Sequence, residues 1–304
     1  MTLTRTDPRA SVRDPTTRIY LALVGKSQVA DAMAGLPLYG KRPARILISY
    51  HFWKKTPELD SVLARMRDEF GGGVLDLFSD SGAYSAFTQG VHVSLDEYIE
   101  WLKTYRTWFT VIGALDVIGD AKGTYDNAVR MRDALGDETP ILPAFHVGEP
   151  WEWLERYVAE FPHIALGGMV PYAGSRRRIL NAWLSKCFTM IPPTTRVHGF
   201  GLTSWEFIKR YTFTSVDSSS WASPGRFAQL AMFDARRGVW ETIEYKGGSM
   251  REGLAHFDLF TDYGIKLSDI AKIEPSKRYV LANAVCVESW KRAETWLHHF
   301  KGRR

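Results

Sequence analysis

The chain has 304 residues, of which 45% are hydrophobic and 13% aromatic, so it can form one large core and does not resemble a disordered protein. Its two cysteines, Cys187 and Cys286, form no Cys-x-x-Cys pair, which excludes a disulfide framework and argues against a structural zinc site. The net charge of +5 and the pI of about 9.1 fit a polyanionic partner, although many proteins are equally basic.

The amino-terminal segment, residues 1–17, lacks the apolar stretch of a secretory signal and is expected to be a flexible basic arm. No run of 18 apolar residues occurs in the sequence, which predicts that no segment spans a membrane. We therefore expect a cytoplasmic protein that has no membrane partner.

Eight short apolar runs, rich in β-branched residues, recur along the first two thirds of the chain. Each is brief and almost continuously apolar, which is typical of a strand that is buried on both faces. The runs are Ile19–Val24, Ile46–Tyr50, Val74–Phe78, Val111–Leu115, Ile141–Phe145, Ile164–Leu166, Val197–Phe200 and Phe213–Val216.

Helical patterns lie between most of these runs. Two capping boxes, Ser94-x-x-Glu97 and Thr203-x-x-Glu206, predict helix starts, and Thr56-Pro57 predicts a third. Further segments with a 3.6-residue apolar period are Tyr125–Leu135, Trp151–Val158 and Ile179–Cys187.

The alternation of eight strands with helices predicts a (β/α)₈ barrel over residues 18–222. An open, doubly wound sheet is the alternative architecture. After Ser220 the pattern changes: Gln229–Asp234 and Val239–Tyr245 predict a β-hairpin, and a last helix is expected near Val285–Phe300. We expect residues 223–304 to pack on the barrel as an appendage.

Three acidic residues, Asp80, Asp116 and Asp217, end the third, fourth and eighth predicted strands. In a barrel these ends meet at one rim, where the chemistry of such folds takes place. A single Asp in this place is often a turn former or a helix cap, but three on one rim favour a site.

Other candidate residues follow the remaining strands. His146 and His198 end or occupy the fifth and seventh strands, and Gly167-Gly168 ends the sixth. The alternative to a functional role is a structural one: a hydrogen-bonded structural residue for either histidine, and a tight turn for the Gly-Gly pair. Tyr84, close after Asp80, is either a core residue or a stacking surface.

Taken in order, these residues resemble the tRNA-guanine transglycosylases. Asp80-Ser81-Gly82-Ala83-Tyr84 is similar to that family's Asp-Ser-Gly-Gly-Phe/Tyr-Gln motif, and Asp116 corresponds to its base-reading Asp. Gly167-Gly168 is similar to its Gly-Gly pair, and His198-Gly199-Phe200-Gly201 to its Gly-x-Gly segment. Ser215-Val216-Asp217, followed by Gly225-Arg226, is similar to its nucleophile strand. These matches cover about residues 75–226.

The sequence departs from that family at several points. It lacks the three-Cys, one-His zinc cluster of the tRNA enzymes. Ala83 replaces a glycine of their motif, and Ser85 replaces a glutamine. His146 lies near the position where those enzymes have a base-reading Gln. A compact, zinc-free member looks more like the DpdA-type transglycosylases of phages and bacteria, which insert 7-deazaguanines into DNA. For a phage-encoded protein, the expected compartment is the cytoplasm of the host.

The resemblance implies a role for each matched residue. It implies that Asp217 is the nucleophile, that Asp80 is the acid and base, and that Asp116 reads the edge of guanine. It also implies a binding role for Ser81, Gly82, Tyr84, His146, Gly167, Gly168, His198 and Gly199. The Gly168 N–H is expected to donate to the base and Tyr84 to stack on it. No metal or other cofactor is required.

The polymer also needs a binding surface. Arg226 is the first candidate, because the spacing of the motif places it after the nucleophile. Arg176-Arg177-Arg178 begins a helix after the Gly-Gly strand and is the second, with a solvated helix face as the alternative. Lys209-Arg210 and Lys291-Arg292 are interpreted as ordinary surface.

The resemblance implies exchange of guanine in DNA for a free 7-deazaguanine base. The alternatives are a tRNA-guanine transglycosylase, a non-catalytic nucleic-acid-binding subunit of such an enzyme, and a barrel glycoside hydrolase. The missing zinc cluster disfavours the tRNA enzyme, and the retained Asp80 and Asp217 disfavour the non-catalytic subunit. The Gly-Gly pair and Asp116 disfavour the glycoside hydrolase. The sequence leaves open whether the protein forms a homodimer.

Overall fold

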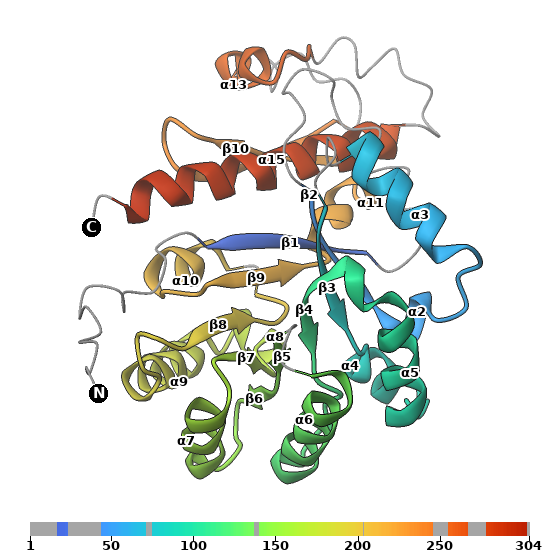
Figure 1. Ribbon diagram of the computed structural model, residues 1–304. Helices are drawn as coiled ribbons and strands as arrows, with labels where there is room; N and C mark the ends of the chain where they lie inside the picture. The colour runs from blue at the N-terminus through green and yellow to red at the C-terminus, as the bar shows by residue number, and fades with distance from the viewer. Residues whose placement is uncertain are drawn as a thin grey trace, which may run out of the picture.

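A computed structural model describes residues 17–23, 44–70, 75–136, 140–202, 204–245, 255–266 and 278–302 (Figure 1). Parallel strands form one closed sheet, and helices surround it. The strands of this sheet are β1 Arg18–Leu23, β2 Ala44–Ser49, β3 Leu75–Asp80, β4 Phe109–Gly113, β5 Ile141–Leu142, β6 Ala144–His146, β7 His163–Gly167, β8 Arg196–Gly199 and β9 Ser215–Ser218.

The sheet closes between β5 and β6. β5 pairs with β4 and β6 pairs with β7, while the two segments are separated only by Pro143. Proline has no N–H to donate to a ladder, but the Pro143 carbonyl still accepts from the Ala165 N–H at 2.9 Å. β5 and β6 are therefore two halves of one fifth strand. The predicted (β/α)₈ barrel is confirmed, and the open doubly wound sheet is wrong.

Both faces of the strands are buried, which explains the continuous apolar runs. Alternate residues such as Ile19 and Leu21 point outward to the helices, whereas Tyr20 points inward. The interior cluster of the barrel consists of Tyr20, Leu47, Phe78, Val111, Leu142, Ala144 and Ala165. Filled by these side chains, the barrel is a packed core and not a pore.

The outer helices begin largely where the sequence predicts. They are α2 Tyr50–Trp53, α3 Leu59–Arg65, α4 Ala83–Thr88, α5 Leu95–Tyr105, α6 Ala121–Leu135, α7 Trp151–Glu160, α8 Val170–Ala173, α9 Arg177–Met190 and α10 Trp205–Arg210. The Ser94 hydroxyl accepts from the Glu97 N–H at 3.4 Å, so this predicted cap is present. Helix α10 has Ser204 as its N-cap, and the predicted cap Thr203 lies outside the described residues.

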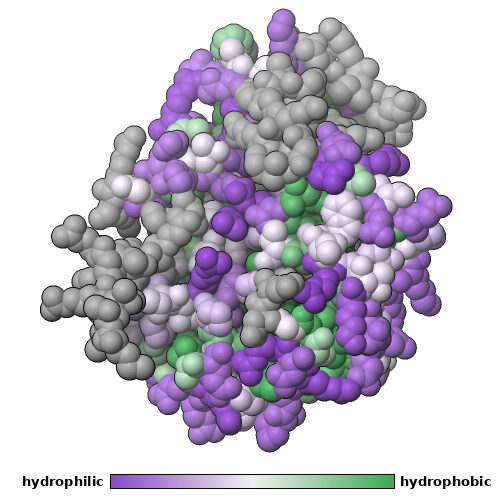
Figure 2. All heavy atoms as spheres, viewed as in Figure 1, coloured by the Kyte–Doolittle hydropathy of each residue, from purple (hydrophilic) through white to green (hydrophobic). Residues whose placement is uncertain are grey.

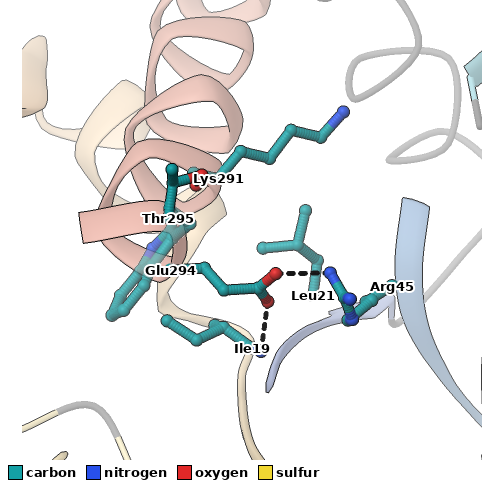
Figure 3. A pocket seen from close by; sticks show the side chains of 7 residues that line it. Ile19, Leu21, Arg45, Lys291, Glu294 and Thr295 are labelled. Carbon is teal, nitrogen blue, oxygen red and sulfur yellow. Dashed lines mark hydrogen bonds and ion pairs between the residues drawn. The ribbon is translucent and has the colours of Figure 1, made fainter. Parts of the chain in front are cut away.

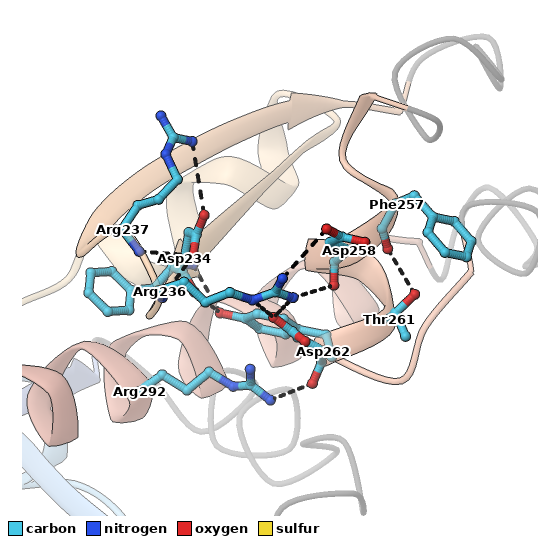
Figure 4. Close-up of polar contacts among 10 residues, drawn as sticks. Asp234, Arg236, Arg237, Phe257, Asp258, Thr261, Asp262 and Arg292 are labelled. Carbon is cyan, nitrogen blue, oxygen red and sulfur yellow. Dashed lines mark hydrogen bonds and ion pairs between the residues drawn. The ribbon is translucent and has the colours of Figure 1, made fainter.

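The region after the barrel forms the predicted hairpin and terminal helix. Its elements are η5 Ser220–Ala222, α11 Ser223–Arg226, β10 Gln229–Asp234, β11 Val239–Glu244, α13 Phe257–Asp262 and α15 Arg278–Lys301. Arg236, at the hairpin turn, forms an ion pair with Asp262 at 2.6 Å, and Arg292 of α15 donates to the Asp262 carbonyl (Figure 4). These contacts join the hairpin, α13 and α15.

Helix α15 lies along the outside of β1 (Figure 1) and is joined to the amino ends of the first two strands. Glu294 forms an ion pair with Arg45, and its other oxygen accepts from the Ile19 N–H at 2.7 Å (Figure 3). Arg45 also lies 3.3 Å from Asp76 at the start of β3. A cavity of about 250 Å³ remains between α15 and these strands, away from the carboxyl ends of the strands.

The face shown in Figure 2 is largely hydrophilic, with apolar side chains gathered mostly between the covering elements. Within the described residues, no helix has the length and apolar character needed to cross a membrane.

We expect Glu294→Gln to destabilise the fold, because an amide has one acceptor oxygen, whereas the carboxylate accepts from both Arg45 and the Ile19 N–H. Exposed ion pairs contribute about 0–1 kcal/mol and breaking buried ones costs about 3–5 kcal/mol, so an intermediate loss of about 1–3 kcal/mol is expected. The measurement is the free energy of unfolding in urea. Glu244→Gln, on the exposed side of β11, is the control. Equal stability of the two variants would contradict a stabilising role for this contact.

Candidate active site

The three aspartates predicted at the rim lie together at the carboxyl ends of the strands. Asp80 ends β3, Asp217 lies in β9, and Asp116 follows β4. Burial raises the pKa of Asp80, the charges of Asp116 and Asp217 raise it further, and hydrogen bonds from Ser49 and Gly82 oppose the rise. The result is a pKa of about 7. The three carboxylates are thus close enough to influence one another.

Asp80 is held in place by two donors to the same oxygen. The Ser49 hydroxyl donates to Oδ2 at 2.8 Å, and the Gly82 N–H donates to it at 3.0 Å. Gly82 has a φ of +75°, and a Cβ at this position would lie 2.6 Å from the His51 Cβ. Glycine is therefore required here for the turn that aims this N–H at Asp80. A carboxyl group with a pKa near 7 can both give and take a proton at neutral pH.

Asp217 is fixed through one oxygen only. The Gly201 N–H donates to Oδ1 at 2.8 Å, and the His198 Nε2 lies 3.3 Å from the same atom. The other nitrogen of His198 is 2.8 Å from the Ser215 hydroxyl, which fixes the orientation of the ring. Within the described part of the chain, Oδ2 of Asp217 has no hydrogen-bond partner, so it is the oxygen available for chemistry.

Asp116 belongs to a chain of three ionisable groups. The His146 Nε2 lies 3.4 Å from Asp116 Oδ2, and the His146 Nδ1 lies 3.1 Å from Glu149 Oε1. Burial lowers the pKa of His146, but the hydrogen bonds and charges of Asp116 and Glu149 outweigh this and raise it to about 10. His146 is therefore a cation at neutral pH, and it orients Asp116. The buried Asp116 Oδ1 has no partner among the described residues.

The Gly-Gly pair makes room for His146. A Cβ on Gly167 would lie 2.7 Å from the His146 Cδ2, so only glycine allows the ring to lie against this strand end. Gly168 has a φ of +68° and is exposed at the rim. Its N–H donates no hydrogen bond within the described part of the chain, which leaves it free for a ligand.

Five residues expected to bind substrate are buried. His198 is fully inaccessible to solvent and lies against Asp217, and Ser81, Gly82, Gly167 and Gly199 are buried as well. The Ser81 hydroxyl accepts from the Ala83 N–H, and Gly199 lies against Phe213. In this structure His198 positions Asp217, and direct contact of these residues with a base stays a prediction.

The remaining predicted residues lie on the surface. Tyr84, on α4, is 61% exposed and is not a core residue. Arg177 forms an ion pair with Glu206 and so belongs to the helix surface, whereas Arg176 and Arg178 are exposed without a carboxylate partner among the described residues. Arg226 is exposed at the end of α11.

Two site residues were missed by the sequence reasoning. Ser49 is the last residue of β2, and a small polar residue near the end of an apolar run was the available signal. Glu149 follows His146 by three residues, a spacing that pairs side chains across a turn.

Within the described residues, no group of three or more His, Cys, Asp or Glu side chains is arranged to hold a metal ion. Neither a known family model nor a curated protein matches the chain. The candidate site is therefore inferred from its geometry.

The raised pKa of Asp80 predicts a pH-dependent stability. The folded state binds the Asp80 proton up to about pH 7, whereas an unfolded Asp releases it near pH 4, so folding loses stability as pH rises between these values. Asp80→Asn should remove this loss, which is at most about 1.4 kcal/mol per pH unit for one proton. Urea unfolding from pH 4 to 8 gives the slopes. Asp126→Asn, at an exposed position, is the control and should keep the wild-type slope. If Asp80→Asn keeps that slope as well, the pKa of Asp80 is not raised.

Proposed function

We propose that the protein exchanges guanine in DNA for a 7-deazaguanine base through a covalent bond between Asp217 and the sugar. The observation that carries the proposal is the pairing of two unlike carboxyl groups at one rim. Asp80 has a pKa of about 7, whereas Asp217 is fixed through Oδ1 and has Oδ2 unengaged. Such a pair supplies a proton donor and a nucleophile in the same site.

In the first half of the proposed reaction, Asp217 Oδ2 attacks C1′ of the sugar. The bond from C1′ to the guanine nitrogen breaks, and Asp80 gives its proton to the departing base. In the second half, Asp80 takes a proton from the incoming base, whose nitrogen attacks C1′ and releases Asp217. Both carboxyl groups return to their starting states, so no oxidant or reductant is consumed.

Asp116 and Gly168 support recognition of guanine. The free Asp116 Oδ1 can accept from the N1–H and N2–H₂ edge, while His146 engages Oδ2. The unengaged Gly168 N–H can donate to O6. A 7-deazaguanine has the same edge, so one pocket serves the leaving and the incoming base.

The basic pI and the exposed Arg226 and Arg176 support a polyanionic polymer as the substrate. The missing zinc cluster favours DNA, with tRNA as the alternative. A purely binding subunit is disfavoured, because it would not need a carboxyl group with a pKa near 7. A cytoplasmic location and a homodimer stay untested expectations.

Asp217→Asn should abolish base exchange and leave the fold intact, because an amide oxygen is too weak a nucleophile to form the covalent intermediate. The assay follows incorporation of labelled guanine into DNA, and thermal unfolding verifies the fold. Asp133→Asn, on the exposed side of α6, is the control and should react at the wild-type rate. Near-normal exchange by Asp217→Asn would remove this residue from its role.

Offered DNA and tRNA in parallel, the protein should incorporate labelled guanine into DNA. Single-stranded DNA should react at least as readily as duplex, because extruding a base from a stack costs a few kcal/mol. Arg226→Ala should weaken binding to all sequences and reduce its dependence on salt, since fewer counterions are released. Incorporation into tRNA alone would overturn the DNA assignment while leaving the chemistry in place.

A further inference from the structure

A second cavity is lined by residues that follow the strand carrying Asp217, beginning with Ser220. It measures about 270 Å³, is open to the surface, and is bordered by η5, α11, the hairpin β10–β11 and α15. Pockets for drug-sized ligands span roughly 300–1,000 Å³, so this one suits a single planar ring system. It is lined by Ser220, Ser223, Pro224, Phe227, Gln229, Ala231, Trp240, Cys286 and Trp290.

Three of the nine residues that line the cavity are aromatic: Phe227, Trp240 and Trp290. The rings of Trp240 and Trp290 lie against each other, with centroids 4.5 Å apart. Phe227 is 69% exposed, which is unusual for a large apolar side chain and places it at the mouth. Aromatic faces of this kind are the surfaces on which single-stranded nucleic acids stack their bases.

Polar groups are present among the apolar ones. Ser220, Ser223 and Gln229 add hydroxyl and amide groups that can both donate and accept. A nucleobase, flat and edged with ring nitrogens and carbonyls, matches both features.

The cavity is close to the proposed reaction. Ser220 lines it and lies three residues after Asp217, a distance of at most about 11 Å along an extended chain. The Ser220 hydroxyl is also 2.6 Å from the hydroxyl of Ser218, the last residue of β9. Arg226 is exposed next to Phe227, where a cation can contact the connecting phosphate.

We propose that this cavity binds a base that flanks the exchanged guanine in the same nucleic-acid strand. The inference rests on the proposed function for the identity of the reacting base, but the cavity itself is a binding site with its own residues. Stacking on Phe227 and the two tryptophans holds the flanking nucleotide, and this fixes the strand while the guanine enters the rim.

The test measures the binding of labelled single-stranded oligonucleotides to the full chain by fluorescence anisotropy. Each strand carries one guanine, and in a matched series one neighbouring nucleotide, on either side, lacks its base. The wild type should bind one of these abasic strands roughly 5- to 100-fold more weakly than the intact strand, as expected for the loss of one stacked base. DNA and RNA series show which polymer supplies the base.

Phe227→Ala should weaken binding of the intact strand by a similar factor and should cancel the penalty of the abasic site, because ring and base are partners in one interaction. Phe227→Trp should restore both. Phe257→Ala is the matched control, since Phe257 is 64% exposed in the same region but does not line the cavity. Because Phe227 is exposed, its replacement leaves the core intact.

The outcomes separate the two proposals. Base exchange with an abasic penalty that is unchanged in Phe227→Ala overturns the flanking-base site but leaves the exchange reaction standing. Cancellation of the penalty without any base exchange supports the site and overturns the proposed function. Failure of the wild type to bind any strand overturns both. A change in oligomeric state in Phe227→Ala, with unchanged strand binding, assigns the patch to contact with a second copy.

Discussion

Mutual repulsion of neighbouring carboxylates is the constraint on which the site depends. Asp80, Asp116 and Asp217 meet where the strands of the barrel end, with Asp217 buried and the other two half-buried. Each is accommodated differently. Asp80 gains a proton, Asp116 gains the cationic His146, and Asp217 gains a backbone N–H and the neighbouring His198. The differences between these partners give three identical side chains three different chemical characters.

The barrel places those partners with little freedom. His146 ends the broken fifth strand and reaches across to the residue that follows the fourth, while Gly167 on the next strand yields the space for its ring. His198 lies inside the barrel against Phe78 and Phe200, so it cannot turn away from Asp217. Orientation in the site therefore comes from the packing of the barrel interior.

Much of this architecture could be predicted from periodicity. The eight apolar runs correspond to the eight strands, since a strand buried on both faces leaves a clear trace in the sequence. The interruption of the fifth strand at Pro143 could not be predicted. It depends on the strand pairing with β4 before the proline and with β7 after it, and the sequence does not show these pairings. The contact between Glu294 and Arg45 was also hidden, because it joins residues far apart in the chain.

The site could also be predicted in part, because the predicted strands place their carboxyl ends at one rim. The ends of the strands showed which acids share the rim, because that follows from the topology alone. Exposure did not follow from the topology: the sequence assigns binding roles to His198, Ser81 and Gly199 without showing that all three are buried. Ser49 and Glu149 carry no distinctive pattern, and their roles emerge only when the distances to Asp80 and His146 are known.

The position of Glu294 has a consequence for how the chain acquires its structure during synthesis. Its carboxylate receives the N–H of Ile19, a residue 275 positions earlier. The first strand of the barrel therefore emerges from the ribosome long before the helix that completes it. Until then Arg45 lacks this carboxylate and the outer side of β1 lacks its cover. During synthesis, the outer side of β1 therefore stays uncovered until residues 278–301 have left the ribosome.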